Sequence, residues 1–176
     1  HEAEVLNTKK LHELAKKTLL KAEKLALEHE KYDYLMVIYS FKKSLSLSYD
    51  NIKDINDYLN QDVSKEKQYL ERLKNTIEFG TLAAEMSAML ATFSSAQARK
   101  DIDKIKSILS SPLLKSPDKA LSFSSLQIYY LMHLSCANLL GKWDIQTYKR
   151  QKEWITYLES NKKRFGYNTW SYLISL

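Results

Sequence analysis

The stretch ANLLGKWDIQTYKRQKEW, residues 137–154, decides the fold class. An apolar run stops at Gly141, and a second amphipathic pattern begins behind Trp143 and Asp144. Glycine commonly ends helices and aspartate is a preferred N-cap, so a helix ends here and another begins. Because only about three residues separate the two long helices, they must lie antiparallel as a hairpin. We expect the indole of Trp143 to fill the wedge between them.

The composition predicts helices along the whole chain. The 176 residues include three glycines and two prolines, too few for the tight turns of a sheet protein of this size. A chain of this length can bury a core without disulfides or a metal ion. We therefore predict an all-α fold, with residues 1–176 forming a single helical domain.

The charge and hydropathy of the chain indicate which classes of protein it can belong to. Apolar residues make up 44% and charged residues 27%, values ordinary for a soluble globular protein, and no window approaches the roughly 18 uncharged apolar residues of a membrane span. The net charge of +6 comes almost entirely from lysine, whereas arginine is the side chain best suited to bidentate phosphate or base contacts. A solvated lysine surface explains this charge, so we expect no nucleic-acid partner. The single Cys136 has no partner in the chain and leaves the compartment open, with the cytoplasm favoured.

The first fifty residues predict two helices. Residues 3–29 have the periodicity of one amphipathic helix. Its polar face carries four lysines: Lys10, Lys17, Lys21 and Lys24. Residues 31–50 are apolar nearly all round, which is typical of a helix packed on more than one side. Their tail SLSLSY alternates like a strand, but no second alternating run is present to pair with it, so helix is favoured.

The middle of the chain predicts a short helix, a break and a long helix. Asp50 can cap the short helix, which fades in the polar stretch NQDVSKEK at 60–67. The long helix covers 64–93, and Gly80 inside it indicates a kink or the close approach of another backbone. We expect this helix to bury one stripe, formed by Leu70, Leu73, Ile77, Ala84, Ala88 and Ala91.

The second half contains further helix starts and one linker. SSAQ at 94–97 is a capping box, and the inward face that follows it comprises Ala98, Ile102, Ile105 and Leu109. The proline- and serine-rich segment 110–117 is interpreted as a linker. Ser116 and Pro117 then predict the start of a helix that ends before Gly141. Gly166 is expected to terminate the helix after Asp144, and a last helix begins near residue 168.

Two junctions carry a family resemblance. GKWD at 141–144 and EKYD at 30–33 both place an aromatic residue and an aspartate between two helices, and Tyr130 lies about thirteen residues ahead of Trp143. On these features the chain resembles a degenerate tetratricopeptide-like (TPR-like) helical repeat, best over 120–165, moderately over 5–48 and hardly in between. The resemblance implies a right-handed α-α superhelix of antiparallel helix hairpins, about seven helices in all. A closed helical bundle is the alternative architecture.

The motifs of helical enzymes are missing from the sequence. Di-iron bundles need Glu-x-x-His pairs, and none occurs. His133 and Cys136 lie one turn apart, but two ligands do not make a metal site, and they are better interpreted as a core pair. Asp101 and Asp103 are interpreted as a solvated face. With no glycine-rich phosphate loop either, we predict that the chain is not an enzyme and needs no cofactor or metal.

Residues 81–102 fit a DNA-reading helix-turn-helix poorly, because the glycine turn is absent and the first helix is too long. A contact surface is better sought on the tyrosine-rich helix SLQIYYLMHL, at 125–134. Tyrosine combines a large apolar body with a hydrogen-bonding tip, so Tyr129, Tyr130 and His133 form the candidate partner-binding surface. The alternative is that both tyrosines fill the core.

These observations lead to a function hypothesis. We expect a non-catalytic protein–protein interaction or scaffold module that presents a concave helical surface to a protein, a peptide or another domain of its own chain. The resemblance places it in a larger bacterial regulator. The alternative is a DNA- or membrane-associated helical regulator that uses the lysine-rich surface. The chain starts at His1 and stops within an apolar pattern that contains Trp170, so we expect an excerpt of a longer chain, with self-association through the C-terminal helix.

Overall fold

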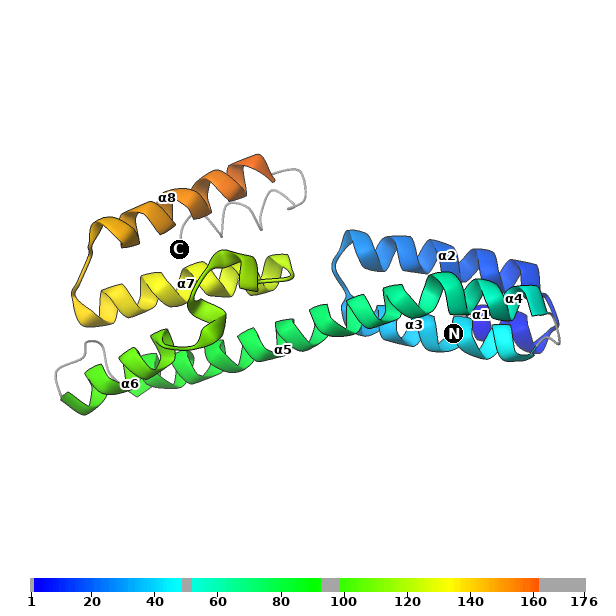
Figure 1. Ribbon diagram of the computed structural model, residues 1–176, viewed down its shortest axis with the longest axis horizontal. Coiled ribbons are helices and arrows are strands. Elements are labelled where there is room, and N and C mark those ends of the chain that lie inside the picture. The colour runs from blue at the N-terminus through cyan, green and yellow to red at the C-terminus, as the bar shows by residue number, and fades with distance from the viewer. Residues whose placement is uncertain (1, 49–51, 93–98, 162–176) are drawn as a thin grey trace. The chain divides into compact units, whose positions relative to one another are not determined.

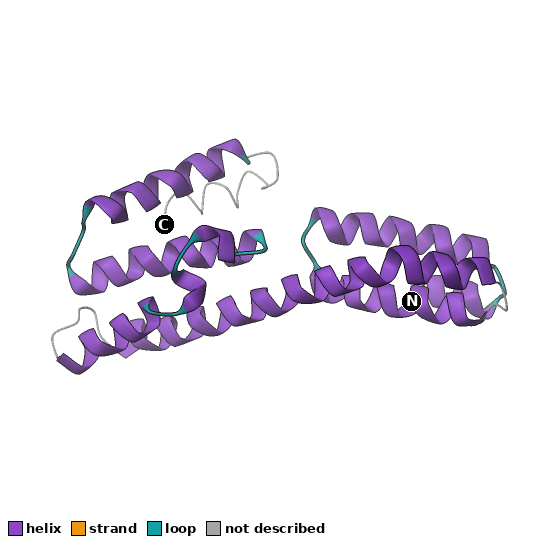
Figure 2. Ribbon diagram, in the orientation of Figure 1, coloured by secondary structure: helices purple, strands orange, loops and turns teal. Residues whose placement is uncertain are grey.

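The computed structural model describes residues 2–48, 52–92 and 99–161 (Figure 1). Throughout these ranges the chain forms helices, turns and short connections, without a strand (Figure 2). The predicted all-α fold is confirmed. The capping box at 94–97, the helix stop at Gly166 and the last helix with Trp170 lie outside the described residues.

The chain divides into two compact units, His1–Asn75 and Thr76–Leu176. The division falls inside the long helix α5, Val63–Thr92, rather than at the segment 110–117 that was interpreted as a linker. Each unit has its own cluster of buried apolar residues, one built from positions up to Leu45 and the other from Phe79 onward. The two units are therefore described separately.

Unit 1 is built on an antiparallel helix hairpin. Its elements are α1 (Glu2–Thr8), α2 (His12–Glu28), α3 (Tyr32–Ser48), α4 (Ile52–Asp57), the π-helical turn η1 (Tyr58–Asp62) and the beginning of α5. The predicted hairpin at EKYD is confirmed, with α2 packed on α3 and α1 packed on α2. The core residues Ala15, Leu19 and Ala26 of α2 contact a row from α3 that comprises Tyr32, Leu35, Ile38, Tyr39 and Leu45.

The single helix predicted over 3–29 is wrong, because the chain turns between α1 and α2. Lys10 adopts a left-handed backbone with φ 59°. The amide of Leu11 donates to Leu6 O at 2.9 Å, and that of Lys10 donates to Asn7 O at 2.8 Å. These two bonds form a Schellman motif, which ends a helix. Glycine normally occupies the left-handed position, so a lysine there gave no sequence signal.

The predicted break at 60–67 is also wrong. The polar segment contains neither glycine nor proline, and η1 carries the helix from α4 directly into α5. Tyr58, at the start of η1, is buried, and its hydroxyl donates to Glu66 Oε2 at 3.0 Å. Polarity in this segment marks an exposed helix surface and not a helix end. Asp50, the predicted cap, lies outside the described residues.

Helix α5 buries mainly the face opposite to the predicted one, and Leu73 is the member of the predicted stripe that packs against a core. Leu70 and Ile77 are 52% and 61% exposed. The alanines of the predicted stripe, Ala84, Ala88 and Ala91, are exposed as well. The buried residues are instead Asn75, Phe79, Met86 and Met89. A Cβ added at Gly80 would meet nothing within 4 Å, so none of the described residues makes the expected close approach there.

Unit 2 comprises the rest of α5 and the elements that follow it. These are α6 (Arg99–Leu109), two 3-10 turns η2 (Pro112–Leu114) and η3 (Pro117–Lys119), α7 (Phe123–Leu140) and α8 (Ile145–Ser160). The inward face predicted for α6 is confirmed at Ile105, which is fully buried, and Ile102 and Leu109 are half-buried. Ala98 lies outside the described residues.

The linker interpretation of 110–117 is wrong. Leu114 is 2% exposed and belongs to the core of unit 2, and the amide of Leu113 donates to Ser111 Oγ at 3.4 Å. The helix predicted from Ser116 also starts later, because Ala120 is extended and Ser122 is the true N-cap of α7, accepting from the amide of Ser125 at 3.1 Å.

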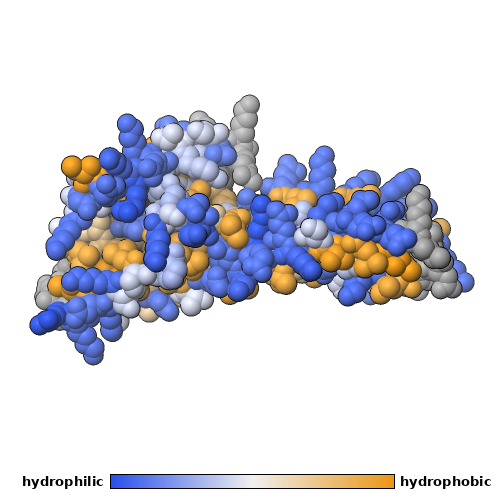
Figure 3. Space-filling view, viewed as in Figure 1, coloured by the Kyte–Doolittle hydropathy of each residue, from blue (hydrophilic) through white to orange (hydrophobic). Residues whose placement is uncertain are grey.

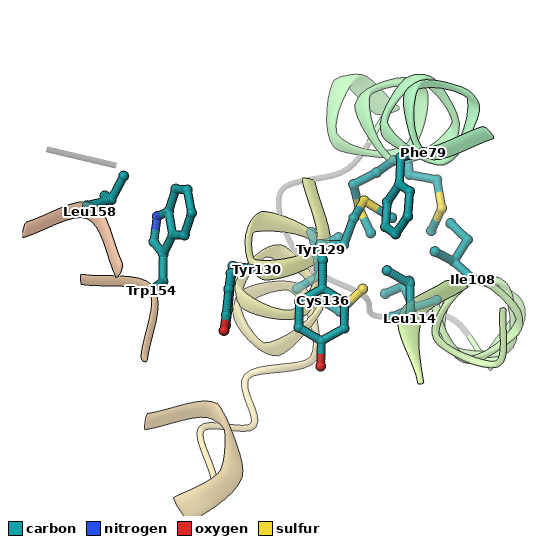
Figure 4. Close-up of a cluster of buried hydrophobic side chains, with 13 residues drawn as sticks. Phe79, Ile108, Leu114, Tyr129, Tyr130, Cys136, Trp154 and Leu158 are labelled. Carbon is teal, nitrogen blue, oxygen red and sulfur yellow. The ribbon is translucent and has the colours of Figure 1, made fainter. Parts of the chain in front are cut away.

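The hairpin at Gly141 is confirmed, although a different tryptophan fills it. Gly141 has φ 60° and ends α7 in a Schellman motif, and Asp144 Oδ1 accepts from the Thr147 amide at 2.8 Å to cap α8. Trp143 is 38% exposed, so the predicted wedge is wrong; its Nε1 donates to Asn138 Oδ1 at 2.9 Å. Trp154 of α8 is the buried indole (Figure 4).

Candidate functional site

The tyrosines predicted as a contact surface lie in the core of unit 2. Tyr129 is 3% exposed and Tyr130 is 6% exposed, and their ring centroids are 5.1 Å apart in an edge-to-face contact. Tyr130 also stacks on Trp154 at 5.3 Å (Figure 4). Both rings therefore fill the core, as the alternative interpretation expected, and the prediction of an exposed tyrosine surface is wrong. Tyr130 also lines a groove whose other lining residues belong to α8.

His133 is also used structurally. Its Nε2 lies 3.0 Å from Leu114 O, so that nitrogen donates to the backbone carbonyl and secures η2 against α7. Burial and the nearby charge of Arg150 lower the pKa of His133. The neighbouring Cys136 is 1% exposed, and burial raises the pKa of its thiol to about 12. A neutral imidazole held by a carbonyl and an uncharged thiol fit the predicted core pair.

No group of three or more His, Cys, Asp or Glu side chains suited to a metal ion occurs in the described ranges. Within the same ranges, no helix combines the length and the apolar content that crossing a bilayer requires. Asp101 is half-buried and Asp103 is exposed. They lie on α6, whose core side is formed by Ile105 and Ile108.

A network of charged side chains in unit 1, of which Glu23 is buried and Lys42 and Asp62 are half-buried, was missed by sequence reasoning. Lys42 Nζ of α3 lies 2.7 Å from Glu23 Oε2 of α2 and 3.2 Å from Asp62 Oδ1 of η1. The Tyr39 hydroxyl donates to the other oxygen of Glu23. Burial opposes the charged form of Glu23, but the hydrogen bonds from Lys42 and Tyr39 outweigh it and hold the pKa of Glu23 below its ordinary value. The network joins three elements and fixes how they pack.

An apolar groove lies between α2 and α3, and Glu2 and Ala3 of α1 also line it. We call it the α2–α3 groove; its volume is about 530 Å³. Its base is formed by buried residues such as Leu19, Ala26 and Ile38. Its walls carry Leu25 at 58%, Val37 at 54% and Tyr34 at 62% exposure. Exposed apolar residues over unit 1 are visible among hydrophilic ones in Figure 3.

Two lysines lie at the rim of this groove. Lys31 lines it, and the exposed Lys21 lies one helical turn before Leu25. Residues four apart lie on the same side of a helix, so Lys21 flanks the apolar wall. The α2–α3 groove thus combines an apolar interior with two lysines at its edge.

The groove was missed because α3 was expected to pack on more than one side. Its apolar residues point in nearly all directions, but only the side with Leu35, Ile38 and Tyr39 is buried. The other side, with Tyr34 and Val37, is open. The only sequence signal was this excess of apolar residues, and it does not distinguish a buried helix from one that binds a partner.

Comparisons with protein-family models, with curated proteins and with solved structures found no match to this chain.

Proposed function

We propose that the chain is a non-catalytic protein-interaction module of TPR-like helix hairpins, and that unit 1 binds an amphipathic helix of a partner protein in the α2–α3 groove. The observation that carries the proposal is the exposure of Leu25, Tyr34 and Val37 around an apolar hollow of about 530 Å³. Large apolar side chains left exposed together on a soluble surface mark interaction sites. A groove of this size accepts several apolar side chains of a partner.

The lining favours a helix over an extended peptide. An extended backbone brings unpaired N–H and C=O groups to the surface it binds, and these need hydrogen-bonding partners. The α2–α3 groove is lined by apolar side chains, with Thr18 and His29 as its few polar residues apart from its charged ends. A helix satisfies its own backbone and presents apolar side chains alone.

The lysine rim favours an acidic partner. Lys21 and Lys31 raise the potential at the edge of the groove, where a helix with Glu or Asp beside its apolar stripe gains complementary contacts. Such exposed pairs contribute mainly to specificity and to the association rate, while the apolar contacts supply most of the affinity.

The test uses a fluorescently labelled model peptide, an amphipathic helix with leucines at helical spacing and glutamates on both flanks. Its anisotropy should rise when the protein is added. Val37→Glu should weaken binding by about tenfold or more, because the apolar contact is lost and a charge is buried. Leu47→Glu is the matched control, since Leu47 lies on the same helix, is 61% exposed and does not line the groove.

Two comparisons make the experiment decisive. A peptide with lysine flanks should bind less tightly than the glutamate version, because the rim repels it. Raising the salt concentration should weaken binding only moderately, whereas binding through nucleic-acid or lipid phosphates weakens steeply. Equal binding by the wild type and by Val37→Glu would contradict the proposed site, and a steep salt dependence would favour the lysine surface alone.

A further inference from the structure

The turn between α7 and α8 carries a cluster of exposed apolar side chains, which we call the hairpin tip: Trp143, Ile145 and Tyr148. Ile145, the first residue of α8, is 73% exposed, more than any other large apolar residue in the described part of the chain. Tyr148 is 58% exposed and Trp143 is 38% exposed. All three belong to unit 2, and the turn lies at one end of the α7–α8 hairpin (Figure 1). The hairpin tip is therefore open to a partner.

Local contacts hold the aromatic side chains of the hairpin tip in place. The rings of Trp143 and Tyr148 lie in contact, with their centroids 5.4 Å apart. Trp143 Nε1 donates to Asn138 Oδ1 at 2.9 Å, which ties the indole to the end of α7. Asp144 Oδ1 accepts from the amide and the hydroxyl of Thr147, and these two bonds fix the first turn of α8. An ordered tip loses less conformational entropy when it binds.

Packing within unit 2 does not account for the exposed isoleucine. The core side of α8 is formed by Thr147, Trp154 and Leu158. Ile145 lies nine residues before Trp154, which is two and a half turns, so the two side chains lie on opposite sides of the helix. Exposed apolar side chains that gather at one place mark a contact with another surface.

Exposed lysines flank the hairpin tip. Lys142 lies directly before its tryptophan, and Lys149 and Lys152 follow on the exposed side of α8. Together with Arg150 they outnumber the two carboxylates found among residues 142–153. The charge around the tip therefore favours a partner whose surface is negative.

We propose that the hairpin tip binds the surface of an anionic lipid membrane. Tryptophan and tyrosine favour the headgroup region of a bilayer, because the ring lies in the apolar part while its N–H or O–H meets water. Lysines close to the surface gain from the negative potential of anionic lipids. Ile145 adds an apolar contact with the acyl chains. This site lies in unit 2 and does not depend on the proposed helix-binding groove of unit 1.

A membrane fits the hairpin tip better than a protein partner does. None of Trp143, Ile145 and Tyr148 lines the groove that contains Tyr130, so the tip offers no hollow there for a side chain of a partner. A protein would need a pocket shaped to receive the tip, whereas the interface of a bilayer accepts projecting apolar side chains and the lysines beside them. With one small tip and a few lysines, we expect reversible binding.

Vesicle co-sedimentation of the whole chain tests the proposal. The protein should bind vesicles with about 30% phosphatidylserine in phosphatidylcholine more tightly than vesicles of phosphatidylcholine alone. Ile145→Glu should weaken this binding by at least about tenfold, because a carboxylate replaces the apolar contact and is repelled by anionic lipid. Leu121→Glu is the matched control, since Leu121 is 44% exposed in unit 2 but lies before the start of α7, at the helix end away from the tip. This variant should bind like the wild type.

The lysines are tested separately from the apolar side chains. Lys142→Gln should weaken binding to the anionic vesicles by about fivefold, because one favourable charge near the surface is lost. It should leave the weaker binding to phosphatidylcholine unchanged. Raising the salt concentration should reduce the difference between the two kinds of vesicle, since salt screens the lysines.

Tryptophan fluorescence locates the contact. Brominated acyl chains quench an indole that enters the bilayer, so vesicles that contain them should quench Trp143. Trp154 is 4% exposed and should not be quenched. Trp143→Phe should remove the quenching and keep most of the binding, because phenylalanine retains an apolar ring.

Four results would overturn the proposal. Two of them are equal binding by the wild type and Ile145→Glu, and equal affinity for both kinds of vesicle. Quenching that persists in Trp143→Phe would assign the membrane contact to Trp170 instead. Self-association without vesicles that Ile145→Glu abolishes would make the tip a contact between copies of the chain. Val37→Glu should bind vesicles like the wild type, and Ile145→Glu should bind the model peptide normally, so failure of this proposal is distinguishable from failure of the proposed groove.

Discussion

Glu30 ends helix α2 in a backbone conformation that glutamate rarely adopts. Its φ is 51°, and the Lys31 amide donates to Ala26 O at 2.8 Å, so the helix stop is a Schellman motif. Lys10 ends α1 in the same way, whereas α7 ends at Gly141. A left-handed backbone costs a residue with a Cβ about 1 kcal/mol or more. The ends of α1 and α2 therefore carry a backbone cost that the glycine at the end of α7 avoids.

Glu30→Gly should stabilise unit 1. The substitution removes the cost of the left-handed backbone, although the extra freedom of glycine in the unfolded chain offsets part of the gain, so we expect about 0.5 kcal/mol. Urea denaturation followed by far-UV circular dichroism measures it. Glu28→Gly is the control, because Glu28 lies in the last turn of the helix, where glycine should destabilise by about 1 kcal/mol. Destabilisation by both substitutions would contradict the strain at Glu30.

His133 makes the stability of unit 2 depend on pH. Burial lowers its folded pKa below the unfolded value of 6.5, so between these two values the unfolded chain binds a proton that the folded chain does not. The stability of unit 2 should therefore decrease as pH falls through 6.5. His133→Gln keeps an N–H that can donate to Leu114 O but cannot titrate, and it should flatten this pH dependence. Urea melts followed by tryptophan fluorescence on both sides of pH 6.5 provide the comparison, and an equal slope in both proteins would contradict the prediction.

At the scale of the helices, the sequence indicated where elements lie better than which faces they bury. Gly141 and Asp144 located the α7–α8 hairpin because their helix-ending and capping roles are local properties. The buried face of α5 could not be predicted in the same way, since the helix has apolar residues on two sides. Periodicity finds both sides, and only the neighbouring elements decide which one is covered.

Substitution of the two tryptophans of the α7–α8 hairpin should separate their roles. Trp154 is 4% exposed and stacks on Tyr130 and on Phe123, whose ring centroid lies 5.8 Å away. Trp154→Ala should therefore cost about 3–5 kcal/mol. Trp143→Ala removes a half-exposed ring and its bond to Asn138 and should cost about 1 kcal/mol. Denaturant melts followed by circular dichroism measure both, and a larger loss for Trp143→Ala would restore the predicted wedge.

At the scale of the whole chain, the sequence predicted helices but not their grouping. The strongest boundary signal was the proline pair at Pro112 and Pro117, yet this segment packs into unit 2 through Leu114. The division between units lies instead inside α5, a continuous helix without any local signal of a boundary. The α2–α3 groove could not be predicted for the same reason. Whether a side of α3 is exposed depends on which other elements pack against it, and not on the sequence of α3 alone. The superhelical arrangement of the hairpins stays a prediction.

The two cores should unfold as separate transitions. The buried cluster of unit 1 and the residues packed on it end at Leu73, and those of unit 2 begin at Phe79, so each core can lose its packing while the other persists. All three tryptophans, at positions 143, 154 and 170, belong to unit 2, whereas circular dichroism reports helices of both units. The fluorescence and circular dichroism curves in urea should therefore not coincide.

Leu35→Ala provides the decisive measurement for this separation. Leu35 is fully buried in unit 1, so its truncation should cost about 2–5 kcal/mol there. The circular dichroism curve should gain an early phase while the tryptophan midpoint stays in place. Leu158→Ala, at a fully buried position of unit 2, should move the fluorescence midpoint instead. If Leu35→Ala moved both signals together, α5 would couple the units into one cooperative body, because a helix shared by two cores can transmit unfolding from one to the other.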